Sequence, residues 1–414
     1  METKDLKFGE LDEGFTIKEA IEEAKRCLNC KNPLCIKGCP IENNIPGFIH
    51  QLSMGNIGAA MHIINEKSNL PAICGRVCPH EKQCVGHCVL NAKKRPIQVG
   101  KLERFAADFD GNMGLIRDKI PQKTRGKVAV IGSGPAGLTV AGDLAREGFN
   151  VMIFEGEQEA GGVLMYGIPE YRLPKDVVRK EVKKIEALGV TFITQCMVGQ
   201  AITVDDMFEQ GFDAVFIGSG TALPKSLDTP GYTLRGVTQS SYFLRMASLC
   251  NTGSIGREEV PVKQGDIVGV IGGGNVAMDA ARTALRMGAG KVYVLFRRTM
   301  DQMSALQTEY NEAVEEGVEF LWETTVTEFI GSNGKLEKIR VKTPEGENFM
   351  PIDRILLAIG SRPANRIVST TSGIEVDDTG YVITKERPYG MTTRKGVFAG
   401  GDVCLLYTSP SPRD

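Results

Sequence analysis

The chain has little of what several classes of protein require. It contains one tryptophan and four histidines, too few for a histidine-rich metal site. Lys and Arg total 49 against 51 for Asp and Glu, so no excess of positive charge is present to bind nucleic acid. No apolar run approaches the ~18 residues needed to cross a bilayer. We therefore expect a protein that binds neither nucleic acid nor membrane.

A secretory signal is also missing from the first residues. Met1-Glu2-Thr3-Lys4-Asp5 does not show a basic segment followed by an apolar one. A cytoplasmic location is the expectation. With 414 residues, of which 42% are hydrophobic and 24% charged, the composition is that of a folded chain with two or three domains.

Cysteine is abundant in one region only. Eight of the eleven cysteines fall between Cys27 and Cys88. Without a secretory signal, metal or cluster ligation is expected in preference to disulfides. The first run, which ends in Cys-Pro, resembles a ferredoxin-type iron–sulfur motif, whereas two structural zinc ions are the alternative. The two runs are Cys27-x2-Cys30-x4-Cys35-x3-Cys39-Pro40 and Cys74-x3-Cys78-Pro79-x4-Cys84-x3-Cys88.

The cysteine region is predicted to be a helical domain over residues 1–122. Thr16 and Glu19 form a capping-box pattern that starts a helix leading to the first cysteines. Further helices are predicted near 56–67 and 98–109. The polar, aperiodic segment 118–126 indicates a domain boundary.

A strand, a glycine loop and a helix follow this boundary. Lys127–Ile131 is a short apolar run, the loop is Gly-x-Gly-x-x-Gly, and a second strand spans Asn150–Phe154. This order predicts a dinucleotide site with the pyrophosphate at the helix N-terminus and an acid on the ribose. A glycine-rich turn without a ligand is the alternative. The residues assigned to this site are Gly132, Gly134, Pro135, Ala136, Gly137 and Glu155.

The same order returns after Ile267–Ile271. There the second strand ends in Arg297 and Arg298, where the first unit has an acid. Guanidinium groups bind a 2′-phosphate that a carboxylate would repel. The first site is therefore predicted to bind FAD and the second NADPH, unless the arginines are a solvated surface pair. The loop residues assigned to the second site are Gly272, Gly274, Asn275, Val276 and Ala277.

The two units belong to a longer repeat. Asp213 follows Gly132 by 81 residues, and Asp353 follows Gly272 by 81 residues. Each of these aspartates begins a further apolar run that ends in glycine. The repeat predicts an α/β fold with two similarly built, Rossmann-like dinucleotide-binding domains.

Together these motifs resemble the small (beta) chain family of NADPH-dependent glutamate synthase. Relatives of this family include the N-terminal half of dihydropyrimidine dehydrogenase and the large subunit of the bifurcating NADH-dependent ferredoxin:NADP oxidoreductase. The resemblance extends over roughly residues 10–403. The motifs that carry it are AKRCLNC, CGRVCP, VAVIGSGPAGLTVAGDLA, GGVLMYGIPEYRLPK, IGGGNVAMDAARTALRMGA, AIGSRPAN and GVFAGGDV.

The resemblance implies an electron-input subunit. It places two [4Fe-4S] clusters in residues 1–122, an FAD domain in 123–225 and 361–403, and an inserted NADP domain in 226–360. NADPH would be oxidised through FAD and the clusters, for a large amidotransferase chain with FMN that makes glutamate from 2-oxoglutarate and glutamine. No side chain is assigned as a catalytic acid or base.

Two other functions stay open at this point. One is the large subunit of the bifurcating oxidoreductase, which would work with a ferredoxin-linked small subunit. The other is a zinc-stapled, non-catalytic nucleotide-binding module.

The resemblance also implies individual ligands, and each cluster would take cysteines from both runs. Cys74 is assigned to neither cluster. Gly161, Gly162 and Leu164 are expected along the flavin, Gly401 and Asp402 at its ribityl chain, and Gly360 at a cofactor. One cluster would be held by Cys27, Cys30, Cys35 and Cys88, and the other by Cys39, Cys78, Cys84 and Glu103.

The end of the sequence departs from the family. Family members follow the GGD motif with a Gly- and Ala-rich stretch and a helix whose N-terminus faces the flavin. Here residues 404–414 contain two prolines among the last five positions, which exclude a regular helix. We expect these residues to be a non-native tail on a truncated chain, and FAD binding to be weakened for this reason.

Overall fold

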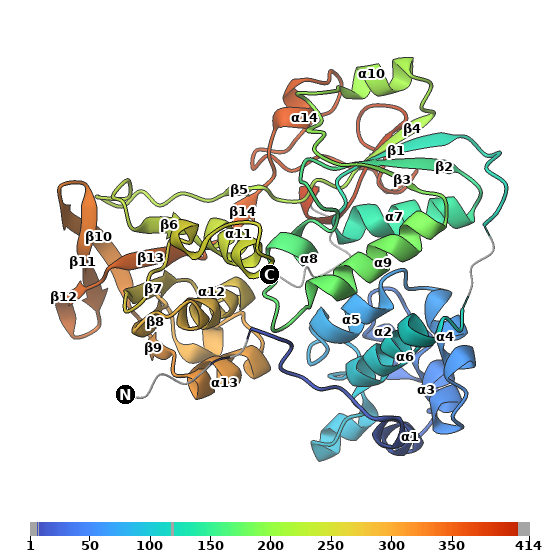
Figure 1. The fold of residues 1–414 in the computed structure, drawn as a ribbon, viewed down its shortest axis with the longest axis horizontal. Coiled ribbons are helices and arrows are strands. Elements are labelled where there is room, and N and C mark those ends of the chain that lie inside the picture. The colour runs from blue at the N-terminus through green and yellow to red at the C-terminus, as the bar shows by residue number, and fades with distance from the viewer. Residues whose placement is uncertain (1–5, 7, 117–119, 405–414) are drawn as a thin grey trace.

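The structure is a computed structural model that describes residues 6, 8–116 and 120–404. Figure 1 shows three parts: a helical part in blue and teal, and two α/β parts, each built around its own sheet. Among the described residues, no helix is both long and apolar enough to cross a membrane. Residues 405–414, most of the tail singled out above, lie outside the described residues.

The helical part begins with the predicted capping box. The Thr16 side chain accepts a hydrogen bond from the Glu19 amide (3.3 Å), and the Glu19 carboxylate accepts one from the Thr16 amide (2.8 Å). The predicted helices near 56–67 and 98–109 are present. The helices are α1 (Ile17–Lys25), α2 (Leu34–Lys37), α3 (Ile45–Ser53), α4 (Ile57–Asn65), α5 (Pro71–Val77), a 3-10 turn (Val89–Lys93) and α6 (Val99–Met113).

Helices α5 and α6 approach each other unusually closely. A Cβ atom at Gly75 in α5 would lie 2.5 Å from the Arg104 amide nitrogen in α6. A Cβ at Gly100 would lie 2.3 Å from the His80 ring. Only glycine leaves room at these two positions, so that α5 and the His80 loop lie directly against α6.

The first sheet is entirely parallel, with strand order β15-β4-β1-β2-β3. Because β15 pairs with β4, the C-terminal segment returns to this sheet after the second one is complete. The predicted fold class, with one dinucleotide domain inserted into the other, is confirmed. The strands are β1 (Lys127–Ile131), β2 (Asn150–Phe154), β3 (Thr191–Ile193), β4 (Ala214–Ile217) and β15 (Val397–Ala399), and the helices are α7 (Pro135–Arg146), α8 (Val163–Tyr166), α9 (Lys175–Ala187) and α10 (Val204–Glu209).

The second sheet is also parallel, in the order β6-β13-β7-β8-β9. Buried valines of β7 and β8 pack against the alanine-rich face of α12. Its strands are β6 (Val237–Gln239), β7 (Ile267–Ile271), β8 (Lys291–Leu295), β9 (Glu319–Leu321) and β13 (Arg354–Leu357), and its helices are α11 (Ser240–Asn251), α12 (Asn275–Arg286) and α13 (Gln307–Glu316).

Two smaller sheets complete the α/β parts. The chain passes between the large sheets along an antiparallel ribbon of β5 (Leu223–Pro224) and β14 (Ser361–Arg362). An antiparallel sheet of β10 (Thr325–Ser332), β11 (Lys335–Thr343) and β12 (Gly346–Pro351) extends from the second part. The sequence reading did not predict this sheet.

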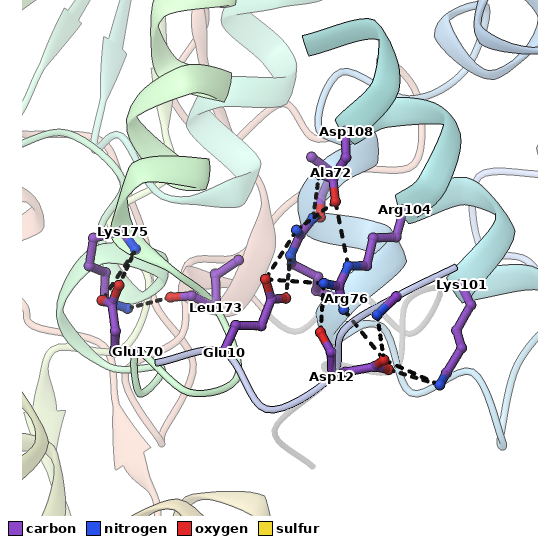
Figure 2. Close-up of polar contacts among 11 residues, drawn as sticks. Glu10, Asp12, Ala72, Arg76, Lys101, Arg104, Asp108, Glu170, Leu173 and Lys175 are labelled. Carbon is purple, nitrogen blue, oxygen red and sulfur yellow. Dashed lines mark hydrogen bonds and ion pairs between the residues drawn. The ribbon is translucent and has the colours of Figure 1, made fainter. Parts of the chain in front are cut away.

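The N-terminal segment is held on α5 and α6 by ion pairs. Figure 2 shows the buried Arg76 between Glu10 (2.7 Å) and Asp108 (2.8 Å). Arg104 pairs with Glu10 at 3.1 Å and donates to the Asp12 carbonyl oxygen at 2.7 Å. These contacts close one side of the α5–α6 pair.

Lys175, the first residue of α9, is the most deeply buried lysine among the described residues. Its ammonium donates to the carbonyl oxygens of Leu164 (2.9 Å), Leu173 (3.2 Å) and Ile168. Burial lowers the pKa of Lys175 to about 8, so the group is still charged at neutral pH. The lysine therefore ties the backbone of α8 to the start of α9.

Replacing this lysine tests how firmly that segment is held. Lys175→Met keeps the aliphatic volume but removes the donor from three carbonyl oxygens, so the free energy of unfolding should fall by about 1–3 kcal/mol. Lys180→Met on the exposed side of the same helix is the control and should stay within about 0.5 kcal/mol. Urea denaturation measures both. Equal stability of the two variants would show that the carbonyl contacts do not matter.

Candidate functional site

The first glycine loop has the geometry of an anion cradle. Gly132 has a φ of +94°, and a Cβ atom at Gly137 would lie 1.9 Å from the Gly132 carbonyl oxygen. By contrast, a Cβ at Gly134 would meet nothing within 4 Å. Gly134 is the N-cap of α7, and no side chain caps this helix end. The open space and the uncapped helix N-terminus fit a pyrophosphate.

Several predicted flavin residues gather at this loop. The Glu155 carboxylate accepts hydrogen bonds from the Ser133 amide (2.9 Å) and hydroxyl, and the Ser133 oxygen accepts one from the Gly161 amide (2.9 Å). A Cβ at Gly162 would lie 3.0 Å from the Gly134 Cα atom. Ser133, which the sequence reading passed over, therefore connects the loop to the predicted flavin segment.

The remaining predicted residues of this site lie in different places. A Cβ at Gly401 would lie 2.9 Å from the Ala136 side chain, so Gly401 and Asp402 adjoin the start of α7. The Leu164 side chain is buried in the core instead of facing open space. Gly360 lies at the crossover between the sheets, where its carbonyl oxygen accepts a hydrogen bond from the Lys225 amide (3.0 Å).

The second glycine loop repeats the first in its main features. Gly272 has a φ of +143°, and a Cβ there would lie 2.3 Å from the Ala358 carbonyl oxygen. Gly274 is the N-cap of α12, again without a side-chain cap. The Asn275 side-chain oxygen accepts from the Leu306 amide (2.9 Å). Val276 and the fully buried Ala277 pack into the core below the loop.

Arg297 and Arg298 are exposed directly after β8. Within the described part of the chain, neither guanidinium makes a hydrogen bond or ion pair. Backbone pairing shows that Phe296, one residue earlier, occupies the position of Glu155: both amides donate to the end of the next strand, at Leu321 and Ile193 respectively. The second unit thus carries a phenyl ring instead of a carboxylate at this position, followed by two available cations.

Four cysteines from both runs line one cavity in the helical part. This cavity is otherwise lined by apolar residues such as Leu34 and Ile49. Burial and the neighbouring Cys27 thiol raise the pKa of Cys35 to about 11. The cysteines that line the cavity are Cys27, Cys30, Cys35 and Cys88, the set expected to hold one cluster.

The second set surrounds Glu103, which is buried in α6. Burial, followed by the Glu103 and Cys39 charges, raises the pKa of Cys84 to about 12. Burial and the nearby Cys74 thiol hold the pKa of Glu103 well above its usual value. Cys78 lies within hydrogen-bonding reach of Cys74. The structure therefore brings Cys74 into the same neighbourhood as the four expected ligands.

The first donor set fits an iron–sulfur cluster, because its four thiols line one cavity. Thiols around a cavity can bind the separated iron atoms of a cluster, whereas one zinc needs four thiolates at a single point.

Comparison with known proteins agrees with these features. Residues 4–115 match a family described as dihydropyrimidine dehydrogenase domain II, 4Fe-4S cluster, and residues 126–413 match the pyridine nucleotide-disulphide oxidoreductases. The glutamate synthase [NADPH] small chain of Halomonas elongata is 35% identical, over 97% of this chain and 89% of that protein. The chain belongs to the glutamate synthase small-chain family. It is an oxidoreductase of the NADPH, FAD and iron–sulfur type that defines this family.

One further relative supports this assignment, and one solved structure has a similar fold. The Escherichia coli glutamate synthase [NADPH] small chain is 33% identical, over 97% of this chain and 90% of its own length. Among solved structures, the His57Gln mutant of FprA from Mycobacterium tuberculosis has a TM-score of 0.59 at 18% identity, over 68% of this chain and 80% of that one. The FprA similarity concerns the fold alone.

The two loop glycines allow a paired test of the first site. Gly134→Ala places its methyl group in open space, so the cofactor-free chain should keep its melting temperature but retain less FAD. Gly137→Ala forces a methyl group onto the Gly132 oxygen and should lower the melting temperature itself. Flavin content and thermal denaturation separate the two effects. If Gly134→Ala retained FAD like the unmodified chain, the cradle would not be the pyrophosphate site.

The cluster ligands need a second comparison, because Cys74 and Glu103 adjoin the same thiols. We predict that Glu103→Ala loses or alters one cluster, since its carboxylate completes the second set, whereas Cys74→Ala keeps both. Iron content and EPR spectra of the reduced variants measure this. Loss of a cluster in Cys74→Ala together with two intact clusters in Glu103→Ala would contradict the interlaced assignment.

Proposed function

We propose that this chain oxidises NADPH at the second glycine loop and passes the electrons, through FAD at the first loop and two [4Fe-4S] clusters, to a large partner chain that makes glutamate from glutamine and 2-oxoglutarate. The observation that carries the proposal is the presence of two uncapped glycine-loop helices and two thiol groups in one chain. The name of the family, which specifies a small chain, supports a large partner chain.

The residues at the first loop would hold and orient the flavin. Gly134 leaves room for the pyrophosphate at the start of α7. Glu155 would accept hydrogen bonds from the ribose hydroxyls, and its link through Ser133 to Gly161 supports this role. When bound, FAD supplies the conversion of a hydride into single electrons that [4Fe-4S] clusters can carry. The chain itself contributes binding, orientation and shielding.

The helical part would hold the clusters close to the flavin part. Leu70 and Ile73, at the start of α5, are buried in the same core as Leu138 of α7 and Val178 of α9. Cys74 lies within α5, and Cys78 is the residue at its C-terminal end. Cys78, one ligand of the second expected set, therefore lies at the end of the helix that packs against the flavin-binding helices, which suits electron transfer between the two sites.

The partner is tested by reconstitution. The anaerobically purified chain is mixed with the large glutamate synthase chain, and NADPH oxidation is followed with glutamine and 2-oxoglutarate present. We expect oxidation that requires both chains and both substrates, with glutamate as the product. NADPH oxidation that ignores the large chain but responds to a ferredoxin would redirect the assignment to the other partner.

The preference for NADPH rests on the exposed arginine pair. In the Arg297→Ala/Arg298→Ala variant, the KM for NADPH should rise about a hundredfold or more, because two charge-assisted phosphate contacts are lost and each is worth ~1.5–3 kcal/mol. The KM for NADH should change little. Steady-state reduction of ferricyanide measures both, with Arg340→Ala on the antiparallel sheet as the control. Equal use of NADPH and NADH by the unmodified protein would contradict the assignment.

A further inference from the structure

The only tryptophan of the chain, Trp322, lies directly after β9 and is partly exposed. Its ring is stacked on Phe320, with centroids 5.3 Å apart and planes at 17°. The edge of Phe296 meets it at 6.2 Å and 86°. Tyr310 of α13 completes the group, with its ring centroid 4.7 Å from that of Phe320 and 6.0 Å from that of Trp322. Four aromatic rings thus form a cluster at the carboxyl edge of the second sheet.

This cluster is joined to the second glycine loop. A Cβ atom at Gly273 would lie 2.5 Å from the Phe296 ring, so the ring covers the loop. The Thr324 amide donates to the Phe296 carbonyl oxygen (3.0 Å), and the Glu323 amide to that of Arg298 (3.0 Å). These two hydrogen bonds hold the Trp322 segment beside the arginine pair.

We propose that Trp322, supported by Phe296 and Phe320, is the platform on which the adenine ring of the nicotinamide dinucleotide stacks. Ligands of open α/β sheets bind in the crevice outside the carboxyl ends of the strands, and the ends of β8 and β9 lie side by side there. A purine base stacks favourably on a large aromatic face, because both are flat and apolar. The inference rests on the proposed NADPH site and adds the residue that recognises the base.

A base platform and a phosphate contact leave different signatures. Removing Trp322 should weaken every adenosine ligand equally, whether or not it carries a 2′-phosphate. Removing the arginines should weaken only ligands with that phosphate. A role for Trp322 in packing alone would produce neither pattern, provided that the variant remains folded.

The experiment is calorimetric titration of the holoprotein with adenosine 2′,5′-bisphosphate and with 5′-AMP, neither of which undergoes redox chemistry. In Trp322→Ala, both dissociation constants should rise about five- to hundredfold, in line with base–aromatic stacking. Trp322→Phe should restore most of the affinity. Phe349→Ala, which removes an exposed ring from β12, is the matched control and should leave both constants unchanged.

Fluorescence gives a second readout, because all tryptophan emission of the unmodified chain comes from Trp322. The emission should change on saturation with either ligand. Unchanged emission, or unchanged affinity in a folded Trp322→Ala, would overturn the platform while leaving the NADPH site standing. Failure of the unmodified protein to bind the 2′,5′-bisphosphate would instead refute the proposed NADPH site, and the platform with it.

Discussion

The contact between α5 and α6 is the constraint on which the arrangement of the sites depends. At Gly75 the two helices touch backbone to backbone, so Glu103 of α6 comes to lie among the thiols that α5 and the following loop present. The ion pairs of Arg76 hold this helix pair against the N-terminal segment (Figure 2). A side chain at Gly75 would force the helices apart and separate the carboxylate from the cysteines.

The opposite face of α5 packs on the flavin part, and the second cysteine run reaches the nucleotide part as well. Lys82 donates to the Ser304 carbonyl oxygen (2.9 Å), and Glu81 accepts from the Gln307 amide (2.8 Å). Ser304 in turn donates its amide to Gly273 in the second glycine loop. Segments of all three parts of the molecule therefore meet beside the second cysteine run.

The features that could be predicted were those formed by residues close together in the sequence. Both glycine loops lie between a strand and a helix, and their glycines stand at the positions where the turn leaves no room for a side chain. The capping box at Thr16 involves only residues that are neighbours in the sequence. The grouping of Cys88 with Cys27 came from resemblance, because spacing cannot tell which distant thiols meet. Phe296 was missed because the loop before β8 is one residue longer than its counterpart in the first unit. Trp322 was missed because Phe296 and Tyr310, which come from other elements, meet it only in the folded chain.

The central claim is that the two thiol groups hold iron–sulfur clusters in the same chain as a flavin. Mössbauer spectroscopy of the anaerobically purified, ⁵⁷Fe-enriched protein tests it most directly, with visible absorption recorded on the same sample. The account predicts iron in two [4Fe-4S] clusters, one of which has an iron site made distinct by carboxylate ligation, together with flavin absorption. A colourless protein that contains zinc in place of iron would contradict it.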